Sequence, residues 1–76
     1  MNAGELVNKM GADLVGRRVM TEECGQYPGG PATVIEIDHD PQSPEIVCLV
    51  RHDTWRDLRS DSGEMGILEN ENLDLI

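Results

Sequence analysis

The residue types best suited to recognition gather in one polar segment, residues 51–59, of the 76-residue chain. The segment holds three of the six basic side chains and the single tryptophan: Arg51, Arg56, Arg59 and Trp55. Arginine and tryptophan dominate the energetics of many protein interfaces. The segment therefore predicts a contact surface for a protein, with the single tyrosine, Tyr27, as a further contact residue. The alternative is that Trp55 closes one end of the fold while the arginines are solvated.

The same sequence predicts no catalytic residue, no metal site and no cofactor. Cys24 follows two glutamates, and their negative charge disfavours the thiolate that a nucleophile needs. Cys48 lies between apolar residues and is predicted to belong to the core. His39 and His52 have neighbouring aspartates, but the chain contains neither a C-x-x-C nor an H-x-x-x-H ligand pair. A phosphate-binding loop and a dinucleotide fingerprint are also missing from the sequence.

Charge narrows the range of partners. Fifteen acidic and six basic residues give a formal net charge of -9. Binding to DNA, RNA or an anionic membrane depends on positive charge, so none of these partners is expected. The basic residues cluster at 9–18 and 51–59, whereas residues 20–50 and 60–76 carry acids and neither lysine nor arginine. This polarity predicts head-to-tail contact between copies of the chain, or an acidic face for a basic partner.

The length of the chain and the absence of a recognisable targeting signal limit the classes of protein to which it can belong. A chain of 76 residues forms one domain, with marginal stability unless something such as oligomerisation supplements the core. Its apolar runs are far shorter than the roughly 20 residues of a membrane helix. The first residues do not read as a secretory signal, and two cysteines make no disulfide framework. We therefore expect a cytoplasmic protein without a membrane partner.

A short helix is predicted at the N-terminus. Asn2 followed by Glu5 has the form of a capping box, and Gly11 stands where a helix C-cap belongs. The apolar face of this helix would consist of Leu6, Val7 and Met10. A helix of about two turns is not stable alone, so it must pack on the rest of the domain. Residues 1–13 are therefore predicted to be a helix and linker, and residues 14–76 a β domain.

From residue 14 onward the pattern is that of short strands separated by glycine, proline and polar turns. The strands are expected at residues 17–20, 32–38, 46–51, 65–68 and 74–76, with one tight helical turn at 69–73. Residues 32–38 are rich in β-branched side chains, and residues 46–51 are apolar on both faces and therefore central. Such strands indicate a small barrel or sandwich, and closure of the sheet would remove its exposed edges.

Three stretches resemble the SH3-like small barrel in their order along the chain. Residues 15–19, Val-Gly-Arg-Arg-Val, resemble its opening strand. Residues 30–37, Gly-Pro-Ala-Thr-Val-Ile-Glu-Ile, resemble the strand after the first long loop in KOW-type members. Residues 63–76 resemble the final hairpin strand, one-turn 3₁₀ helix and terminal strand. The resemblance implies a mainly-β fold, an SH3-like small barrel of about five short antiparallel strands, here preceded by a short helix.

The departures from this superfold limit what function the resemblance implies. Peptide-binding SH3 domains use an aromatic groove for proline-rich segments, and here Leu68 and Glu69 stand where an aromatic residue and a proline are usual. KOW-type members often contact RNA, which the acidic charge opposes. Type II dihydrofolate reductases use a Val-Gln-Ile-Tyr segment, and the matching residues 65–68 contain neither Gln nor Tyr.

These observations favour a small acidic, non-enzymatic binding module that acts on a protein partner or on a second copy of itself. Two alternatives remain open. The first is an inhibitor that imitates nucleic acid and is encoded by a phage or mobile element, which requires carboxylates spaced like phosphates on one face. The second is a pore-forming enzyme of the small-barrel type, which requires polar residues that converge on a symmetry axis. The superfold alone does not choose between them.

Overall fold

The computed structural model describes residues 1–39, 42, 45–56 and 62–76 of the chain. Within these residues the elements are α1 (Ala3–Met10), the 3₁₀ helix η1 (Gly11–Leu14), β1 (Arg18–Thr21), β2 (Gly30–His39), β3 (Ile46–His52), β4 (Glu64–Leu68) and β5 (Leu73–Leu75). The expected mainly-β fold, with five antiparallel strands and a short N-terminal helix, is confirmed. The resemblance to the SH3-like family stays a prediction. Neither described helix is long and apolar enough to cross a membrane.

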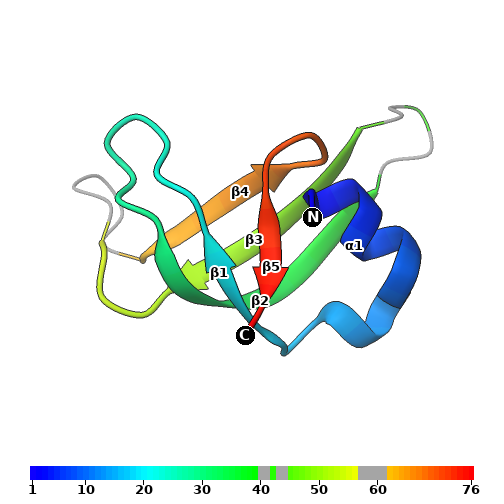
Figure 1. Cartoon of the computed structure of the whole chain (residues 1–76), viewed down its shortest axis with the longest axis horizontal. Helices are drawn as coiled ribbons and strands as arrows, with labels where there is room; N and C mark the ends of the chain where they lie inside the picture. Colours follow the sequence, from blue (N-terminus) through cyan, green and yellow to red (C-terminus); the bar gives the residue numbers. More distant parts are fainter. Residues whose placement is uncertain (40–41, 43–44, 57–61) are drawn as a thin grey trace.

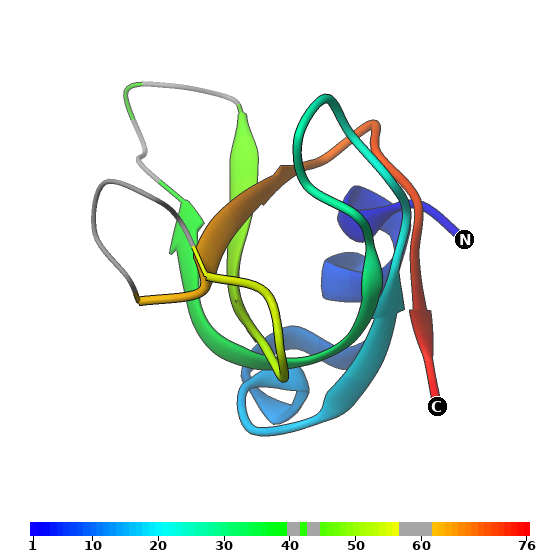
Figure 2. The same cartoon turned by 90° about the vertical axis from the view of Figure 1, so that its left-hand side faces the viewer.

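The five strands form one antiparallel sheet in the order β4-β3-β2-β1-β5. β2 pairs with β1 through its first residues and with β3 over most of its length, and a bulge between Val34 and Glu36 interrupts the β2–β3 register. Bulges bend a strand and increase its twist. Figure 2 shows the consequence, a sheet that curls strongly around its own interior. The expected closure is only partial, because β4 and β5 remain the two edges of the sheet.

The N-terminal helix packs at one end of the curled sheet, on the opposite side from the β1–β2 loop (Figure 1). The predicted caps are confirmed: the Asn2 side chain accepts a hydrogen bond from the Glu5 amide, and Gly11 ends the helix at φ 57°. Ala3 and Leu6 are buried in the core. The Ala3 amide also donates to the Glu71 carbonyl, at 2.9 Å, so the chain entering α1 is joined to the β4–β5 turn.

The core consists of aliphatic side chains and one aromatic ring. Its fully buried larger members are Tyr27, Leu14, Leu73, Val19, Val34, Val50 and Cys48. Alternate residues of β3 point inward, and this pattern confirms that Cys48 belongs to the core. Burial raises the pKa of the Cys48 thiol, so the thiolate is disfavoured there.

Several boundaries differ from the sequence-based expectations. The last strand is Leu73–Leu75 rather than 74–76, and the expected helical turn at 69–73 is a tight turn closed by a 3.0 Å bond from the Glu71 amide to the Leu68 carbonyl. Residues 11–13, expected as a linker, belong to η1, which continues from α1 and places Leu14 in the core. Local sequence does not define these ends, because long-range pairing of β5 with β1 decides where the last strand begins.

Candidate functional site

An aromatic cluster closes the end of the fold that lies away from α1. Tyr27, from the β1–β2 loop, meets the ring of His52 edge-on at 5.4 Å between centroids and the ring of Trp55 at 5.1 Å. Such edge-to-face pairs stabilise beyond the area they bury. Tyr27 is only 2% exposed and its hydroxyl lies 2.8 Å from Thr21 Oγ1. Burial raises the pKa of Tyr27. Tyr27 therefore lies within the fold rather than on its surface.

Trp55 is half-buried and packs against the core through Tyr27. The structure thus gives Trp55 part of the role of closing the fold, and it also leaves part of the indole exposed. The two roles predicted from the sequence do not exclude each other, and the geometry is compatible with both at once. Contact of the exposed part with a partner stays a prediction.

The His52 side chain organises the segment that holds Trp55. It is 4% exposed, and its Nδ1 accepts hydrogen bonds from the Thr54 amide at 3.0 Å and the Trp55 amide at 2.7 Å. With Nδ1 accepting, Nε2 carries the proton and donates to the Gly29 carbonyl at 2.6 Å. One ring therefore joins the β1–β2 loop to the segment after β3.

The arginines of the predicted contact segment make different contacts. Arg56 donates from Nη1 to the carbonyls of His52, at 3.0 Å, and Trp55, at 2.8 Å, so it holds the turn. Arg51 is exposed and donates to Glu64 at 3.0 Å across the β3–β4 pair. Arg59 lies outside the described residues. The predicted contact residues are thus partly committed to the fold, and their role with a partner stays a prediction.

A further arginine, Arg18, was not predicted from the sequence and lies beside the segment that holds Trp55. Arg18 of β1 binds Asp53 through both guanidinium nitrogens and also donates to Thr33 Oγ1 at 2.9 Å. The guanidinium holds the pKa of the Asp53 carboxyl below its usual value. A hollow of about 310 Å³ lies beside these residues, with Thr33, Ile35, Arg51, His52, Asp53 and Arg56 in its lining. The partnership of Arg18 and Asp53 carries no signal in the sequence, because the two residues are 35 positions apart.

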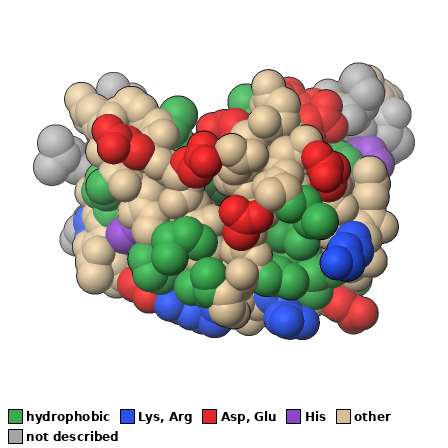
Figure 3. Space-filling view, in the orientation of Figure 1, with side chains coloured by type: hydrophobic (Ala, Val, Ile, Leu, Met, Phe, Trp, Pro, Cys, Tyr) green, Lys and Arg blue, Asp and Glu red, His purple; other side chains and the backbone are tan. Residues whose placement is uncertain are grey.

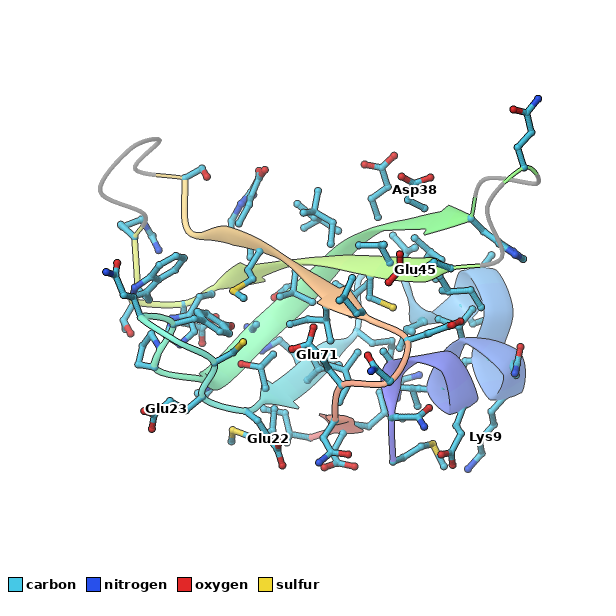
Figure 4. All side chains as sticks on the ribbon, turned by 90° about the horizontal axis from the view of Figure 1, so that it is seen from above. Lys9, Glu22, Glu23, Asp38, Glu45 and Glu71 are labelled. Carbon is cyan, nitrogen blue, oxygen red and sulfur yellow. The ribbon has the colours of Figure 1, made fainter. Side chains whose placement is uncertain are left out.

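Acidic residues line a second hollow, between the β1–β2 loop and the β4–β5 turn. This acidic notch has a volume of about 150 Å³ and is lined by Glu22, Glu23, Cys24, Ile67, Asn70, Glu71 and Asn72. Two of its carboxylates are oriented: Glu22 accepts from Asn72 Nδ2 at 2.8 Å, and Glu71 accepts from the Leu68 amide at 3.0 Å. Figure 4 shows Glu22 and Glu23 on the side of the loop and Glu71 on the side of the turn.

No lysine or arginine of the described residues lines this notch, but the Met1 amine lies near enough to Glu22 for that carboxylate to help raise the pKa of the amine. Three positive groups of the described residues form ion pairs with a carboxylate: Arg18 with Asp53, Arg51 with Glu64 and the Met1 amine with Asp74. In Figure 3 acidic side chains lie over the upper and middle parts of the molecule and also along its lower edge, beside lysine and arginine side chains. The separation of charge predicted from the sequence is therefore only partial on this face.

Nucleophilic and metal-binding groups do not converge among the described residues. Both cysteines are free thiols, Cys24 exposed in the β1–β2 loop and Cys48 in the core. Within the described part of the chain no group of three or more His, Cys, Asp or Glu side chains could hold a metal ion. No family model, curated protein or solved structure matches the chain.

Proposed function

We propose that the protein is a small, non-catalytic binding module that holds a positively charged segment of a partner protein at the acidic notch. The observation that carries this proposal is that three glutamates from two different loops, Glu22, Glu23 and Glu71, line one hollow. A guanidinium or ammonium group placed there would form charge-assisted hydrogen bonds, which are about twice as strong as neutral ones. The net charge of -9 would also steer a basic partner toward the surface.

The size of the notch favours a side chain over a free small molecule. Typical small-molecule sites enclose about 300–1,000 Å³. The notch, at about 150 Å³, suits the head group of one arginine or lysine. The rest of the basic segment would then lie along the acidic surface on either side. Nucleic-acid mimicry and pore-forming catalysis stay predictions, and so does the SH3-like family.

Titration with a fluorescently labelled arginine-rich peptide tests this proposal, with a glutamate-rich peptide of equal length as the control ligand. The notch variant is Glu23→Gln/Glu71→Gln, in which the new amide at 71 still accepts a bond from the Leu68 amide. The matched control is Glu5→Gln/Asp13→Asn, which removes the same charge from exposed positions on α1 and η1.

We expect the notch variant to bind the arginine-rich peptide about tenfold more weakly, or about 1.4 kcal/mol, because each lost contact contributes on the order of 1 kcal/mol or less. The control variant should lose no more than about threefold, through the net charge alone. Equal losses in the two variants would mean that diffuse charge, rather than the notch, attracts the peptide. If the wild-type chain binds both peptides alike, the proposal fails.

A further inference from the structure

Two backbone amides in the segment after β3 share one acceptor, the Nδ1 atom of the His52 ring. The Thr54 amide donates to this nitrogen at 3.0 Å and the Trp55 amide at 2.7 Å. The chain is bent at residues 53 and 54, and the Trp55 ring beyond the bend packs against Tyr27 at 5.1 Å between centroids. The position of Trp55 therefore depends on a nitrogen that can take up a proton.

The His52 ring is held on its other sides by the fold. Nε2 donates to the Gly29 carbonyl at 2.6 Å, and Tyr27 meets the ring edge-on at 5.4 Å. A Cβ atom at Gly30 would lie 3.2 Å from Nε2, so the backbone of the β1–β2 loop packs closely against the ring. His52 is also the last residue of β3 and pairs with Ala32 of β2. The ring is thus fixed by the sheet and the loop, whereas the two amides depend on the ring.

Protonation acts on one side of this ring only. A proton on Nδ1 turns that atom from an acceptor into a donor. Its N–H would then face the Thr54 and Trp55 amides, which are donors themselves, so both hydrogen bonds must break. Nε2 donates to Gly29 in the neutral and in the charged ring, so the contact with the loop can remain.

The charged groups beside His52 oppose one another. Asp53 attracts a positive ring, but its carboxylate is bound by both guanidinium nitrogens of Arg18 from β1. Arg56 donates from Nη1 to the His52 carbonyl at 3.0 Å and adds positive charge next to the same residue. The carboxylate of Asp53 is therefore already engaged, and it does not replace the lost partners of Nδ1.

Groups on the neighbouring elements do not supply a competing change of charge. Histidine ordinarily titrates between about pH 8 and about pH 5, which we call the histidine range. Burial raises the pKa of Tyr27 in the β1–β2 loop, and Arg18 lowers the pKa of Asp53, so both of these groups titrate outside the histidine range. Glu64 of β4 is paired with Arg51 at 3.0 Å.

We propose that His52 is a pH-sensitive switch that controls the segment carrying Trp55. With the ring neutral, the two amides are held and the indole packs against Tyr27. With Nδ1 protonated, the amides of Thr54 and Trp55 lose their acceptor, the bend opens and the indole moves further into solvent. The sheet and the Gly29 contact remain, so the change is a local opening and not global unfolding. The surface that Trp55 offers to a partner thereby differs between neutral and mildly acidic solution.

The fluorescence of Trp55, the single tryptophan, reports this opening in the full chain. On acidification through the histidine range we expect the wild-type emission maximum to move to longer wavelength, while far-ultraviolet circular dichroism keeps its strand signal. Protection of the Thr54 and Trp55 amides against hydrogen exchange should fall at least about tenfold. The Asp53 amide donates to the Pro31 carbonyl at 3.2 Å instead, so it should keep its protection and serves as an internal control.

Two substitutions separate the tasks of the two ring nitrogens. His52→Asn keeps an acceptor for the following amides and cannot titrate, so its emission maximum should stay at the neutral wild-type value throughout the histidine range. His52→Gln keeps a donor that can reach toward Gly29 but removes the acceptor at Nδ1, so its maximum should be shifted already at neutral pH. The matched control His39→Gln removes the other histidine, which is exposed on β2, and should respond like wild type.

Three results would overturn the proposal: a wild-type maximum that stays constant through the histidine range, the same shift in folded His52→Asn, or a shift that coincides with loss of the strand signal. If neither His52 variant folds, the exchange experiment on wild type decides. Equal loss of protection at Asp53 and Trp55, or no loss at Trp55, would then refute the switch. Glu23→Gln/Glu71→Gln should keep the pH response, so failure of the switch is distinguishable from failure of the notch.

Discussion

Replacement of Trp55 by alanine separates its two roles. Trp55 is half-buried, and its ring packs edge-on against Tyr27 at 5.1 Å. Complete removal of a buried large aromatic ring costs about 3–5 kcal/mol, so loss of a half-buried one should cost about 2 kcal/mol. For a domain of this size 1 kcal/mol shifts the melting temperature by about 4–8 °C. Trp55→Ala should therefore lower the melting temperature by about 8–16 °C.

The assay combines thermal unfolding with sedimentation on the same samples. Trp55→Phe serves as the matched variant, because it keeps an aromatic edge against Tyr27 and should recover at least half of the loss. The backbone amide of residue 55 still donates to His52 in both variants, so the turn itself is preserved. In wild type, the tryptophan emission maximum should lie between those of a buried and a solvated indole.

An unchanged melting temperature in Trp55→Ala, together with loss of self-association or of peptide binding, would refute this reasoning. Trp55 would then be an interface anchor, as its charged neighbours in the sequence suggest. A melting temperature lowered as expected, with association retained, would assign Trp55 to the fold.

Three further changes probe the strand, the ion pair and the loop. Val34→Ala should cost about 2 kcal/mol in chemical denaturation, because Val34 is fully buried, whereas Ile35→Ala, at the bulge, should cost less than about 1 kcal/mol. Asp53→Asn should lower the melting temperature at neutral pH. Arg18 lowers the pKa of Asp53 in the folded state, so the Arg18–Asp53 ion pair stabilises the fold fully at pH values above the unfolded-state pKa of about 3.9. The difference in melting temperature between Asp53→Asn and wild type should therefore vanish as the pH falls through the lowered folded-state pKa. Gly29→Ala should destabilise by more than about 1–2 kcal/mol, because its φ of +74° suits glycine and its Cβ would lie 2.7 Å from backbone atoms.

For each of these three predictions, one experimental result would contradict the reasoning. Equal losses at positions 34 and 35 would place both side chains in the core and contradict the register of β2. A pH-independent difference for Asp53→Asn would show that charge plays no part in its contact. Gly11→Ala is the control for Gly29→Ala, because φ is also positive at Gly11 but no atom lies within 4 Å of its Cβ. Equal effects of the two glycine changes would contradict the close approach at Gly29.

Much of the architecture could be predicted because its signals are local. The cap of Asn2 and the end of α1 at Gly11 depend on residues within one or two turns of each other. The β-branched run in β2 and the alternation in β3 each mark a strand without reference to the rest of the chain. Charge and composition are read directly from the chain, so the net charge of -9 followed from its residues alone.

Only the tertiary structure decided which distant residues meet, because that depends on how the sheet curls. The sequence pattern places His52 as a polar residue at the start of a loop. In the structure its ring is buried and forms hydrogen bonds with both Gly29 and the turn at Trp55. Tyr27 likewise sits in a glycine-rich loop, and the curl of the sheet places it beside His52. The acidic notch needs Glu22 and Glu71, which come together only when the last turn packs beside the first long loop. Sequence alone determined the elements and the charge, whereas pairing across the sheet determined the sites, since contacts between residues far apart in the chain leave no local pattern.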